Sequence, residues 1–477
     1  MSLVKRVFKN TLVLICGNIG EKFLTLISSI ILARFLGPQK LGIYSFVFAY
    51  LGFFNIFVDL GIRSIIDREI SKTPEKKDVL VGRGMCLRFF VSLIVIFVAN
   101  LIISFTDYPQ LTKNLIYISS LSFLFAFSSL YLTVFEVNLI MEYPVMIRLF
   151  SAGLKVFLFY LIAKTFNSLY LFVSATLFLS VVNVFLLRLF SKKLLSPEWK
   201  IDLKVWKYLL KESWPLILTS FFVMVYNRID QVMLYSMAGE EEVGYYSVAV
   251  RLVEAIRIIP NAFMTSLFPL LSRFFIDSEE KFKKSYFFAI KYLTIIGFSF
   301  VILFSFAGKE IITFFYGKQY FPSMKVLKIL VWAELFIFLH IVNNSLVISI
   351  NYQKILFFIV GFSASLNVIL NLLLIPKWKM VGASLATLIS YGFLPFLIAI
   401  FKRTREFFDI LFKNFCKIIF IGMIIFLLGS NLQKLEMLNS LEILGFTFLL
   451  FFACLFLTKN LTIEDLKILK EIFKRKG

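Results

Sequence analysis

The stretch that decides the fold runs from residue 226 to residue 273 and reads YNRIDQVMLYSMAGEEEVGYYSVAVRLVEAIRIIPNAFMTSLFPLLSR. It predicts two apolar helices, each long enough to cross a bilayer, joined by a short acidic turn. Arg228 and Asp230 lie on the first predicted helix, and Arg251, Glu254 and Arg257 lie on the second. Charge is costly where it faces lipid, so these five residues are expected to face a bundle interior or a water-filled cavity.

The rest of the chain has the composition of a membrane protein. Of its 477 residues, 60% are hydrophobic, and apolar runs of about 20 residues recur along its length. These runs predict an all-α integral membrane protein with about fourteen transmembrane helices. The predicted spans are residues 11–34, 41–60, 84–105, 114–136, 146–165, 168–190, 213–236, 243–271, 286–307, 325–349, 355–375, 381–401, 414–430 and 441–457.

The distribution of lysine and arginine predicts the orientation of these spans. With the N-terminus inside, the inner segments carry 33 of these residues and the outer loops carry 10. Positive residues accumulate on the cytoplasmic side of membrane proteins. Both termini are therefore predicted to be cytoplasmic in a multi-pass protein of the cell membrane. The net charge of +22 then needs no nucleic-acid partner.

An internal repeat predicts two halves. The segments LGPQKLGIYSFVFA (36–49) and AGEEEVGYYSVAVR (238–251) align without gaps at an offset of 202 residues. The offset spans six predicted helices, an even number, so the two halves should have the same orientation. We expect two six-helix lobes, residues 1–190 and 213–401, related by a pseudo-two-fold axis along the membrane normal.

The remaining segments are expected to lie around these lobes. Residues 191–212 predict a cytoplasmic amphipathic linker whose apolar side chains face the bilayer, namely Trp199, Val205, Trp206 and Leu209. Residues 414–457 predict two peripheral transmembrane helices, because their central portions carry no charge. Residues 458–477 predict a basic amphipathic cytoplasmic tail.

Further charges lie near the predicted middle of the bilayer, about ten residues from each end of a span. They are Glu21 and Lys22 on the first span, Lys155 on the fifth and Glu334 on the tenth. Together with the charges of the 226–273 stretch they make five cations and four acids. A cationic surplus in a cavity suits an anionic substrate, and arginine suits phosphate especially well. The alternative is that the charges neutralise one another in pairs that fix helix packing.

Two further features concern the eighth predicted span. Subtracting the repeat offset places the uncharged residues Ala49, Gly52 and Asn55 opposite Arg251, Glu254 and Arg257, so the second half should carry most substrate contacts. Pro260 follows the charges. A proline inside a helix removes a hydrogen bond, so Pro260 is a predicted hinge.

Catalytic and cofactor motifs are missing from the sequence. Gly317-Lys318 is preceded by Ile312 where a phosphate-binding loop requires its first glycine. We find no nucleophile elbow and no zinc motif, and the four cysteines show no pairing pattern. The sequence predicts no enzyme activity, no cofactor and no metal site.

Three stretches resemble a known family. ILARFLGPQKLGIYSFVFAY (31–50), the 226–273 hairpin and NVILNLLLIPKWKMVGASLATLISYG (367–392) are similar to spans of Wzx-type polysaccharide flippases. These belong to the multidrug/oligosaccharidyl-lipid/polysaccharide (MOP) exporter superfamily. The resemblance implies a monomer that works by alternating access. Its substrate would be an oligosaccharide on a polyprenyl phosphate or pyrophosphate, whose lipid tail stays in the bilayer.

The resemblance also implies roles for the charged residues. Arg228, Arg251 and Arg257 would contact the headgroup. Lys155 and Lys22 are further candidate headgroup contacts because they lie near the predicted middle of the bilayer. Asp230 and Glu254, with Glu21 and Glu334, would form ion pairs or take part in coupling to Na⁺ or H⁺. The competing hypothesis is a cation-coupled multidrug (MATE-like) antiporter, whose chemistry would favour a surplus of acids in the cavity.

Overall fold

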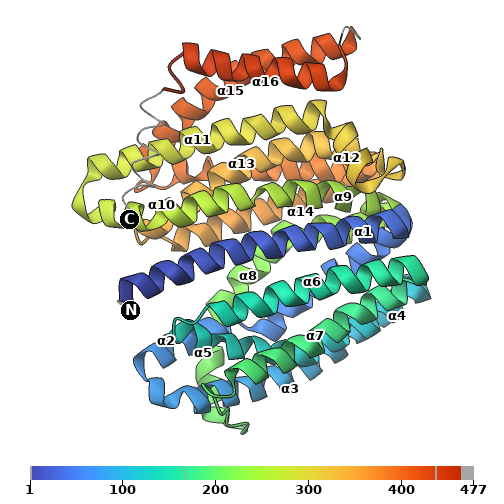
Figure 1. Cartoon of the computed structure of the whole chain (residues 1–477), viewed down its shortest axis with the longest axis vertical. Helices are drawn as coiled ribbons and strands as arrows, with labels where there is room; N and C mark the ends of the chain where they lie inside the picture. The colour runs from blue at the N-terminus through green and yellow to red at the C-terminus, as the bar shows by residue number, and fades with distance from the viewer. Residues whose placement is uncertain (1–2, 167, 436–437, 463–477) are drawn as a thin grey trace. The chain divides into compact units, whose positions relative to one another are not determined.

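The computed structural model describes residues 3–166, 168–435 and 438–462 (Figure 1). Every regular element in those ranges is a helix, which confirms the predicted all-α class. The elements are α1 (Leu3–Asp59), α2 (Ile62–Lys72), η1 (Pro74–Lys76), α3 (Lys77–Ser104), α4 (Gln110–Ser120), η2 (Leu121–Tyr131), α5 (Leu132–Val137), α6 (Glu142–Thr165), α7 (Leu169–Ser191), α8 (Leu203–Ala238), α9 (Glu240–Ile256), α10 (Ile258–Asp277), α11 (Glu279–Phe306), α12 (Gly308–Tyr316), η3 (Lys318–Tyr320), α13 (Ser323–Ser349), α14 (Lys354–Phe393), η4 (Leu397–Ile400), α15 (Arg405–Lys434) and α16 (Ser440–Leu457).

Twelve helical stretches of the described residues are long and apolar enough to cross a membrane. Two of them, Leu12–Lys72 and Lys354–Ile400, are 61 and 47 residues long, about twice what one crossing needs. Each contains a residue with non-helical backbone, Gly37 (φ 73°) in α1 and Lys379 (φ 49°) in α14. Both residues lie between two spans that were predicted from the sequence, so each long stretch corresponds to two predicted spans. The total of fourteen crossings stays a prediction.

The chain packs as two compact units. Unit 1 comprises Met1–Arg251 and Val368–Ala383, and unit 2 comprises Leu252–Asn367 and Ser384–Gly477. The division therefore falls within α9, immediately after Arg251. The lobe boundaries predicted from the sequence repeat, with a linker at residues 191–212, are a different partition and stay a prediction.

The two turns of the sequence repeat have the same backbone conformation. Gly37 has φ 73° and ψ 173°, and Gly239 has φ 92° and ψ 176°. Side chains rarely tolerate such positive φ values, so glycine is the residue that permits this turn in both copies. The shared geometry supports the alignment of the repeat at these positions.

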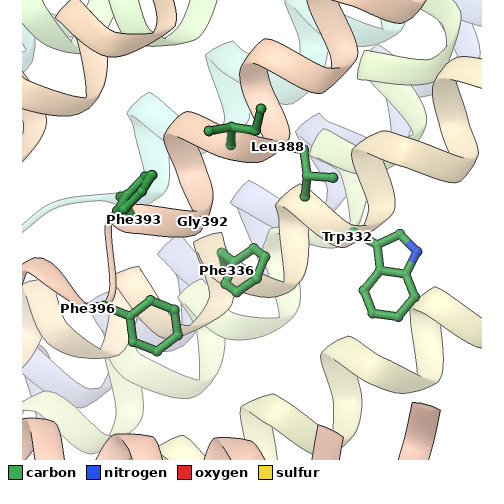
Figure 2. Close-up of a pocket in the computed structure, with 7 residues that line it drawn as sticks. Trp332, Phe336, Leu388, Gly392, Phe393 and Phe396 are labelled. Carbon is green, nitrogen blue, oxygen red and sulfur yellow. The ribbon is translucent and has the colours of Figure 1, made fainter. Parts of the chain in front are cut away.

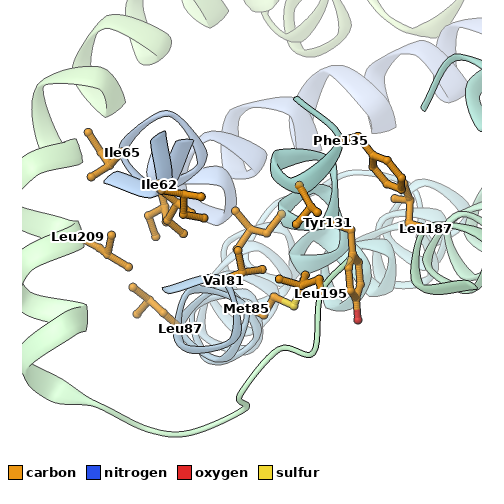
Figure 3. Packing of buried hydrophobic residues seen from close by; sticks show 14 of the residues in the cluster. Ile62, Ile65, Val81, Met85, Leu87, Tyr131, Phe135, Leu187, Leu195 and Leu209 are labelled. Carbon is orange, nitrogen blue, oxygen red and sulfur yellow. The ribbon is translucent and has the colours of Figure 1, made fainter. Parts of the chain in front are cut away.

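Unit 1 has a buried apolar core at the end of the unit that holds α2 (Figure 3). Ile62, Ile65, Ile66 and Ile70 recur at helical spacing on α2, so one face of this short helix is apolar. That face packs against Val81 and Met85 of α3 and against residues of η2, α5, α7 and α8. The opposite face carries ion pairs, including Arg68 with Glu212 at 2.8 Å.

A fully buried arginine fixes the turn between α1 and α2. Arg88 on α3 donates to the carboxylate of Asp59 at 2.6 Å, to the Asp59 backbone oxygen at 2.7 Å and to the Ser129 hydroxyl. The next two residues, Leu60 and Gly61, have positive φ values of 54° and 63°. These bonds satisfy both terminal nitrogens of a guanidinium that would otherwise be buried at high cost, while its Nε has no hydrogen-bond partner in the described part of the chain. They therefore hold the chain where it leaves α1.

Three of the four apolar residues of the predicted linker pack on protein, so these three do not face the bilayer as expected; the amphipathic cytoplasmic linker itself stays a prediction. Leu209 is completely buried in the core of unit 1, and Val205 and Trp206 pack against it. The Trp206 indole donates to the Arg83 carbonyl at 3.0 Å. Trp199 is half-exposed and contacts Phe127 edge to face.

The linker ends at a capped helix start. Residues 195–202 are non-helical, and α8 begins at Leu203. The Asp202 carboxylate accepts from the backbone N–H groups of Lys204 and Val205 and pairs with Arg83 at 2.5 Å. The Val205 hydrogen bond and the Arg83 charge hold the pKa of Asp202 below its usual value. The amphipathic pattern correctly identified Val205, Trp206 and Leu209 as residues of an apolar face, and in the structure that face packs on protein.

Unit 2 is built around α11 and α13, whose side chains are mostly buried. α15 presents a single buried stripe, Phe407, Leu411, Phe415, Ile418, Gly422, Ile425 and Gly429. Gly422 and Gly429 lie directly against Phe298 and Phe306 of α11. The opposite face of α15 exposes large apolar residues such as Phe420 and Leu427. Of the predicted tail at 458–477, residues 463–477 lie outside the described part of the chain.

Candidate functional site

The structure divides the predicted charged cluster between the two units. Unit 1 contains Glu21 and Lys22 on α1, Lys155 on α6, Arg228 and Asp230 on α8, and Arg251 on α9. Unit 2 contains Glu254 on α9, Arg257 between α9 and α10, and Glu334 on α13. The residues are therefore considered within each unit.

Arg257 and Glu334 form a two-point ion pair. The Arg257 Nε donates to Glu334 Oε2 at 2.7 Å, and the Arg257 Nη2 donates to Glu334 Oε1. The Glu334 side chain is 3% exposed and that of Arg257 is 19% exposed. The parallel fork is the strongest geometry that an arginine makes with a carboxylate. Of the predicted site residues, this pair most closely matches the alternative of charges neutralised in pairs.

The helix carrying Arg257 is interrupted at that residue. α9 ends at Ile256, and α10 begins at Ile258 with Arg257 as its N-cap. Pro260 lies in the first turn of α10 and cannot donate a hydrogen bond to the carbonyl of Ile256. The interruption at Arg257 lies three residues before Pro260, where the sequence predicts a hinge. A hinge motion at Pro260 stays a prediction.

Asp230 is buried in unit 1 and accepts two hydrogen bonds from uncharged groups. The Tyr246 hydroxyl donates to Asp230 Oδ2 at 2.7 Å, and the Asn371 amide donates to Asp230 Oδ1 at 2.6 Å. The carboxylate is 4% exposed. Hydrogen bonds to a buried carboxylate offset much of its desolvation cost. Arg228, two residues earlier on the same helix, is partly buried.

Arg251 and Lys155, called here the cationic pair, are two cations of unit 1 whose charges repel each other without a direct contact between them. Arg251 Nη2 lies 3.5 Å from the Ser45 hydroxyl, at the limit of a hydrogen bond, and its Nη1 is buried without a hydrogen-bond partner. Lys155 lies 5.2 Å from the centre of the Phe159 ring and experiences the positive charge of Arg251. Neither residue forms a salt bridge with a carboxylate within the described residues. Two cations held together without an acid make a local surplus of positive charge.

Of the two predicted site charges on the first half of α1, Glu21 forms an ion pair and Lys22 is exposed. Glu21 pairs with Arg148 of α6 at 3.2 Å, and Arg148 also donates to Asn18 at 3.0 Å. Lys22 is exposed on the surface of the chain. The structure does not bring Lys22 into the cationic pair, and its role as a headgroup contact stays a prediction.

Two residues of this region had not been singled out from the sequence. Tyr246 lies within the repeat segment 238–251, and Asn371 is an amide within the apolar run NVILNLLLI. A polar residue inside an apolar span is itself a signal, because it needs a partner at that depth. The sequence does not show which residue is the partner of Asn371. In the structure it is Asp230 on another helix, 141 residues away in the chain.

Unit 2 contains an apolar cleft of about 400 Å³ (Figure 2). Its walls come from α13 and from the last turns of α14 and the residues that follow. All lining residues are apolar or glycine: Trp332, Phe336, Leu388, Ile389, Gly392, Phe393 and Phe396. The rings of Phe336 and Phe396 also contact Phe415 of α15 at 5.7 and 5.5 Å. Such a cleft can hold hydrocarbon but offers no partner for a charged headgroup.

Comparison with known proteins agrees with this architecture. A model of the polysaccharide biosynthesis protein family matches residues 7–275, and a model of the MatE family matches residues 215–373. An uncharacterized membrane protein of Methanocaldococcus jannaschii is 29% identical over 197 residues, which cover 41% of this chain and 46% of that protein. A putative O-antigen transporter of Shigella flexneri is 24% identical over 380 residues, 74% of this chain and 88% of that protein.

A solved structure shows the same fold. The lipid II flippase MurJ in an inward closed conformation superposes with a TM-score of 0.69 at 16% identity, covering 92% of this chain and 98% of that one. The resemblance stated from the sequence is thus confirmed at the level of family and fold. Because the first family model spans more than half of the chain, this multi-pass membrane protein belongs to the polysaccharide biosynthesis protein family of the MOP superfamily.

Proposed function

We propose that the protein is a flippase that moves a lipid-linked oligosaccharide across the cytoplasmic membrane by alternating access. The family match and the transporter among the relatives support export of a glycan. The substrate would carry its sugars on a polyprenyl phosphate or pyrophosphate. We further propose that it works as a monomeric transporter and not as an enzyme, with both termini cytoplasmic as the lysine and arginine distribution predicts.

The observation that carries the proposal is the cationic pair Lys155–Arg251. A buried guanidinium nitrogen without a partner is costly unless a ligand satisfies it during the protein's work. A phosphate oxygen would accept from it and would also offset the repulsion between the two cations. Arg257 has its charge balanced by Glu334 and is a weaker candidate. The polyprenyl chain would stay in the bilayer.

Asp230 is the best candidate for coupling to a cation. It is a buried carboxylate that accepts hydrogen bonds from Tyr246 and Asn371, and a carboxylate oxygen is a ligand that H⁺ or Na⁺ could use. The MatE match over residues 215–373 favours a second candidate function, a cation-coupled drug antiporter, over the same part of the chain. Arg251 lies within the residues that match the MatE model, and Lys155 lies outside them. Two cations in a substrate site would repel cationic drugs, which argues against the antiporter.

The test is flipping of a fluorescent polyprenyl-pyrophosphate oligosaccharide in proteoliposomes. Loss of one charge-assisted hydrogen bond of about 1.5–3 kcal/mol should slow flipping by Arg251→Met about tenfold to a hundredfold. Lys155→Met should also slow flipping. Lys164→Met removes an exposed lysine from the same helix and serves as the matched control.

Two results would count against the flippase. Normal flipping by folded Arg251→Met and Lys155→Met proteins would remove the cationic pair from the mechanism. Cation-driven export of an organic cation from the same vesicles, with no glycan flipping, would favour the antiporter.

A further inference from the structure

The two repeat turns meet in a reciprocal backbone contact. A Cβ atom on Gly42 would overlap the carbonyl oxygen of Glu240, and a Cβ atom on Gly244 would overlap the carbonyl oxygen of Pro38. The repeat offset of 202 relates Gly42 to Gly244 and Pro38 to Glu240. Each copy therefore inserts the same glycine against the same carbonyl of the other copy. Only glycine permits this approach, because any side chain would separate the two backbones.

Side chains extend the contact in two layers. Above the glycines, the Gln39 amide donates to the Glu240 carboxylate at 2.6 Å. Beside them, the Phe46 ring stacks on the Tyr235 ring with centroids 3.9 Å apart, and Tyr235 shares a 2.8 Å hydrogen bond with Thr112. Both rings are buried.

Arg251 of the cationic pair lies on the same helix as Gly244, behind this contact. Gly244, Ser247 and Arg251 recur at helical spacing on one face of α9, so Arg251 is two turns, about 10 Å, below Gly244. Its guanidinium reaches across to Ser45 of the other copy, three residues from Gly42. Both serines are buried beneath the glycines. An anion at Arg251 is therefore shut off from the end of the protein at which the turns meet.

The contact is also of a kind that can open. It joins the copies through backbone van der Waals contact, one ring stack and a few hydrogen bonds, and the α9 helix leaves unit 1 for unit 2 immediately after Arg251. Separation would expose the two glycine turns and the Phe46 and Tyr235 rings but would leave the helices folded, so its cost is smaller than that of unfolding either helix pair. Such a contact suits a gate better than a permanent joint.

We propose that the reciprocal Gly42–Gly244 contact is the outer gate of the transport cycle. It closes over the cationic pair in the state described here, and it separates to open that site to the outer side. The proposal relies on the proposed function only for the protein being an alternating-access transporter. The position of the gate on the outer side follows from the lysine and arginine distribution.

The first test needs no substrate. In a background in which the four native cysteines are replaced, Ser247→Cys is exposed to a membrane-impermeant thiol reagent added outside. Labelling should be slow, and the added Gly42→Ala should raise it at least fivefold because the new methyl group forces the turns apart. Gly153→Ala is the matched control, since a Cβ there meets nothing within 4 Å. Equal labelling in the three proteins would overturn the gate.

The second test locks the contact. Gln39→Cys and Glu240→Cys are introduced together and joined by a short bifunctional thiol reagent. Glycan flipping in proteoliposomes should fall at least tenfold and return after reduction, while each single-cysteine protein flips normally. Normal flipping by the cross-linked protein would overturn the gate, and so would failure to cross-link when both cysteines react singly. If no protein flips glycan but the labelling result holds, the substrate assignment is wrong and the gate stands.

Discussion

Replacing Glu334 by glutamine should destabilise the protein by about 3 kcal/mol. Removing one partner of a buried ion pair typically costs about 3–5 kcal/mol, because the other charge stays buried and loses that partner. We expect the lower end of that range, since 19% of the Arg257 side chain is exposed and can be partly hydrated. The amide of glutamine keeps an acceptor for one of the two hydrogen bonds but carries no charge.

The reverse change should cost somewhat less. Arg257→Met leaves Glu334 buried, but a buried carboxyl can take up a proton and become neutral. Arg257→Met should lower the free energy of unfolding by about 2–3 kcal/mol. Two hydrogen bonds are lost, and protonation removes only part of the cost of burying the Glu334 carboxyl. The double variant Arg257→Met/Glu334→Leu removes both charges, and its stability should return to within about 1 kcal/mol of the original.

The assay is unfolding of the purified protein by SDS titration in mixed micelles, analysed as a double-variant cycle. Lys164→Met, which removes an exposed cation, should change stability by no more than about 0.5 kcal/mol. A double variant less stable than both single variants would refute the reasoning, because the pair would then interact with further charged groups. If a stable double variant flips glycan normally, Arg257 serves helix packing. If a stable double variant no longer flips glycan, Arg257 contacts the headgroup.

Two further predictions concern contacts that position the helices. Asp59→Ala should cost about 1.5–3 kcal/mol in the same assay, because Arg88 is fully buried and loses its carboxylate, whereas Asp59→Asn keeps an acceptor and should cost less. Equal losses would show that the acceptor does not matter. Gly422→Ala should cost about 1–3 kcal/mol by forcing the added methyl group against Phe298, while Gly445→Ala, where nothing lies within 4 Å, should be neutral or stabilising. A neutral Gly422→Ala would mean that α15 does not pack tightly on α11.

The sequence predicts which residues carry costly charge, but not their partners. Arg257, Glu334 and Asp230 all stood out because an ionised side chain inside an apolar span needs compensation wherever it points. The partner depends on which helices become neighbours. Glu334 lies 77 residues from Arg257, and Asn371 lies 141 residues from Asp230. No local spacing rule connects such pairs, so the choice between paired charges and a cationic cavity stayed open.

The linker shows a second limit of sequence reasoning. Periodicity correctly identified Val205, Trp206 and Leu209 as members of one apolar face. It cannot distinguish a face that meets lipid from one that meets protein, because both present hydrocarbon. The buried Leu209 and the indole hydrogen bond of Trp206 to the Arg83 carbonyl decide for protein.

The repeat turns show the opposite case, in which sequence carried structural detail. Two glycines aligned at the same offset predicted equivalent turns, and Gly37 and Gly239 do share their backbone conformation. The alignment of Gly42 with Gly244 gave no sign that the two copies touch each other. That contact exists only when both hairpins are folded and meet, so it is a property of the assembled unit.

The same repeat bears on why Arg251 is charged. Arg251 reaches from one copy to Ser45 of the other, and the equivalent contact would run from Ala49 to Ser247. Alanine has no donor, and the buried Ser247 hydroxyl has no hydrogen-bond partner within the described residues. One copy therefore packs against the other without this bond, so the fold does not need it on either side. We therefore propose that the buried, unsatisfied Nη1 of Arg251 serves a ligand, and a phosphate is the ligand whose charge and geometry fit.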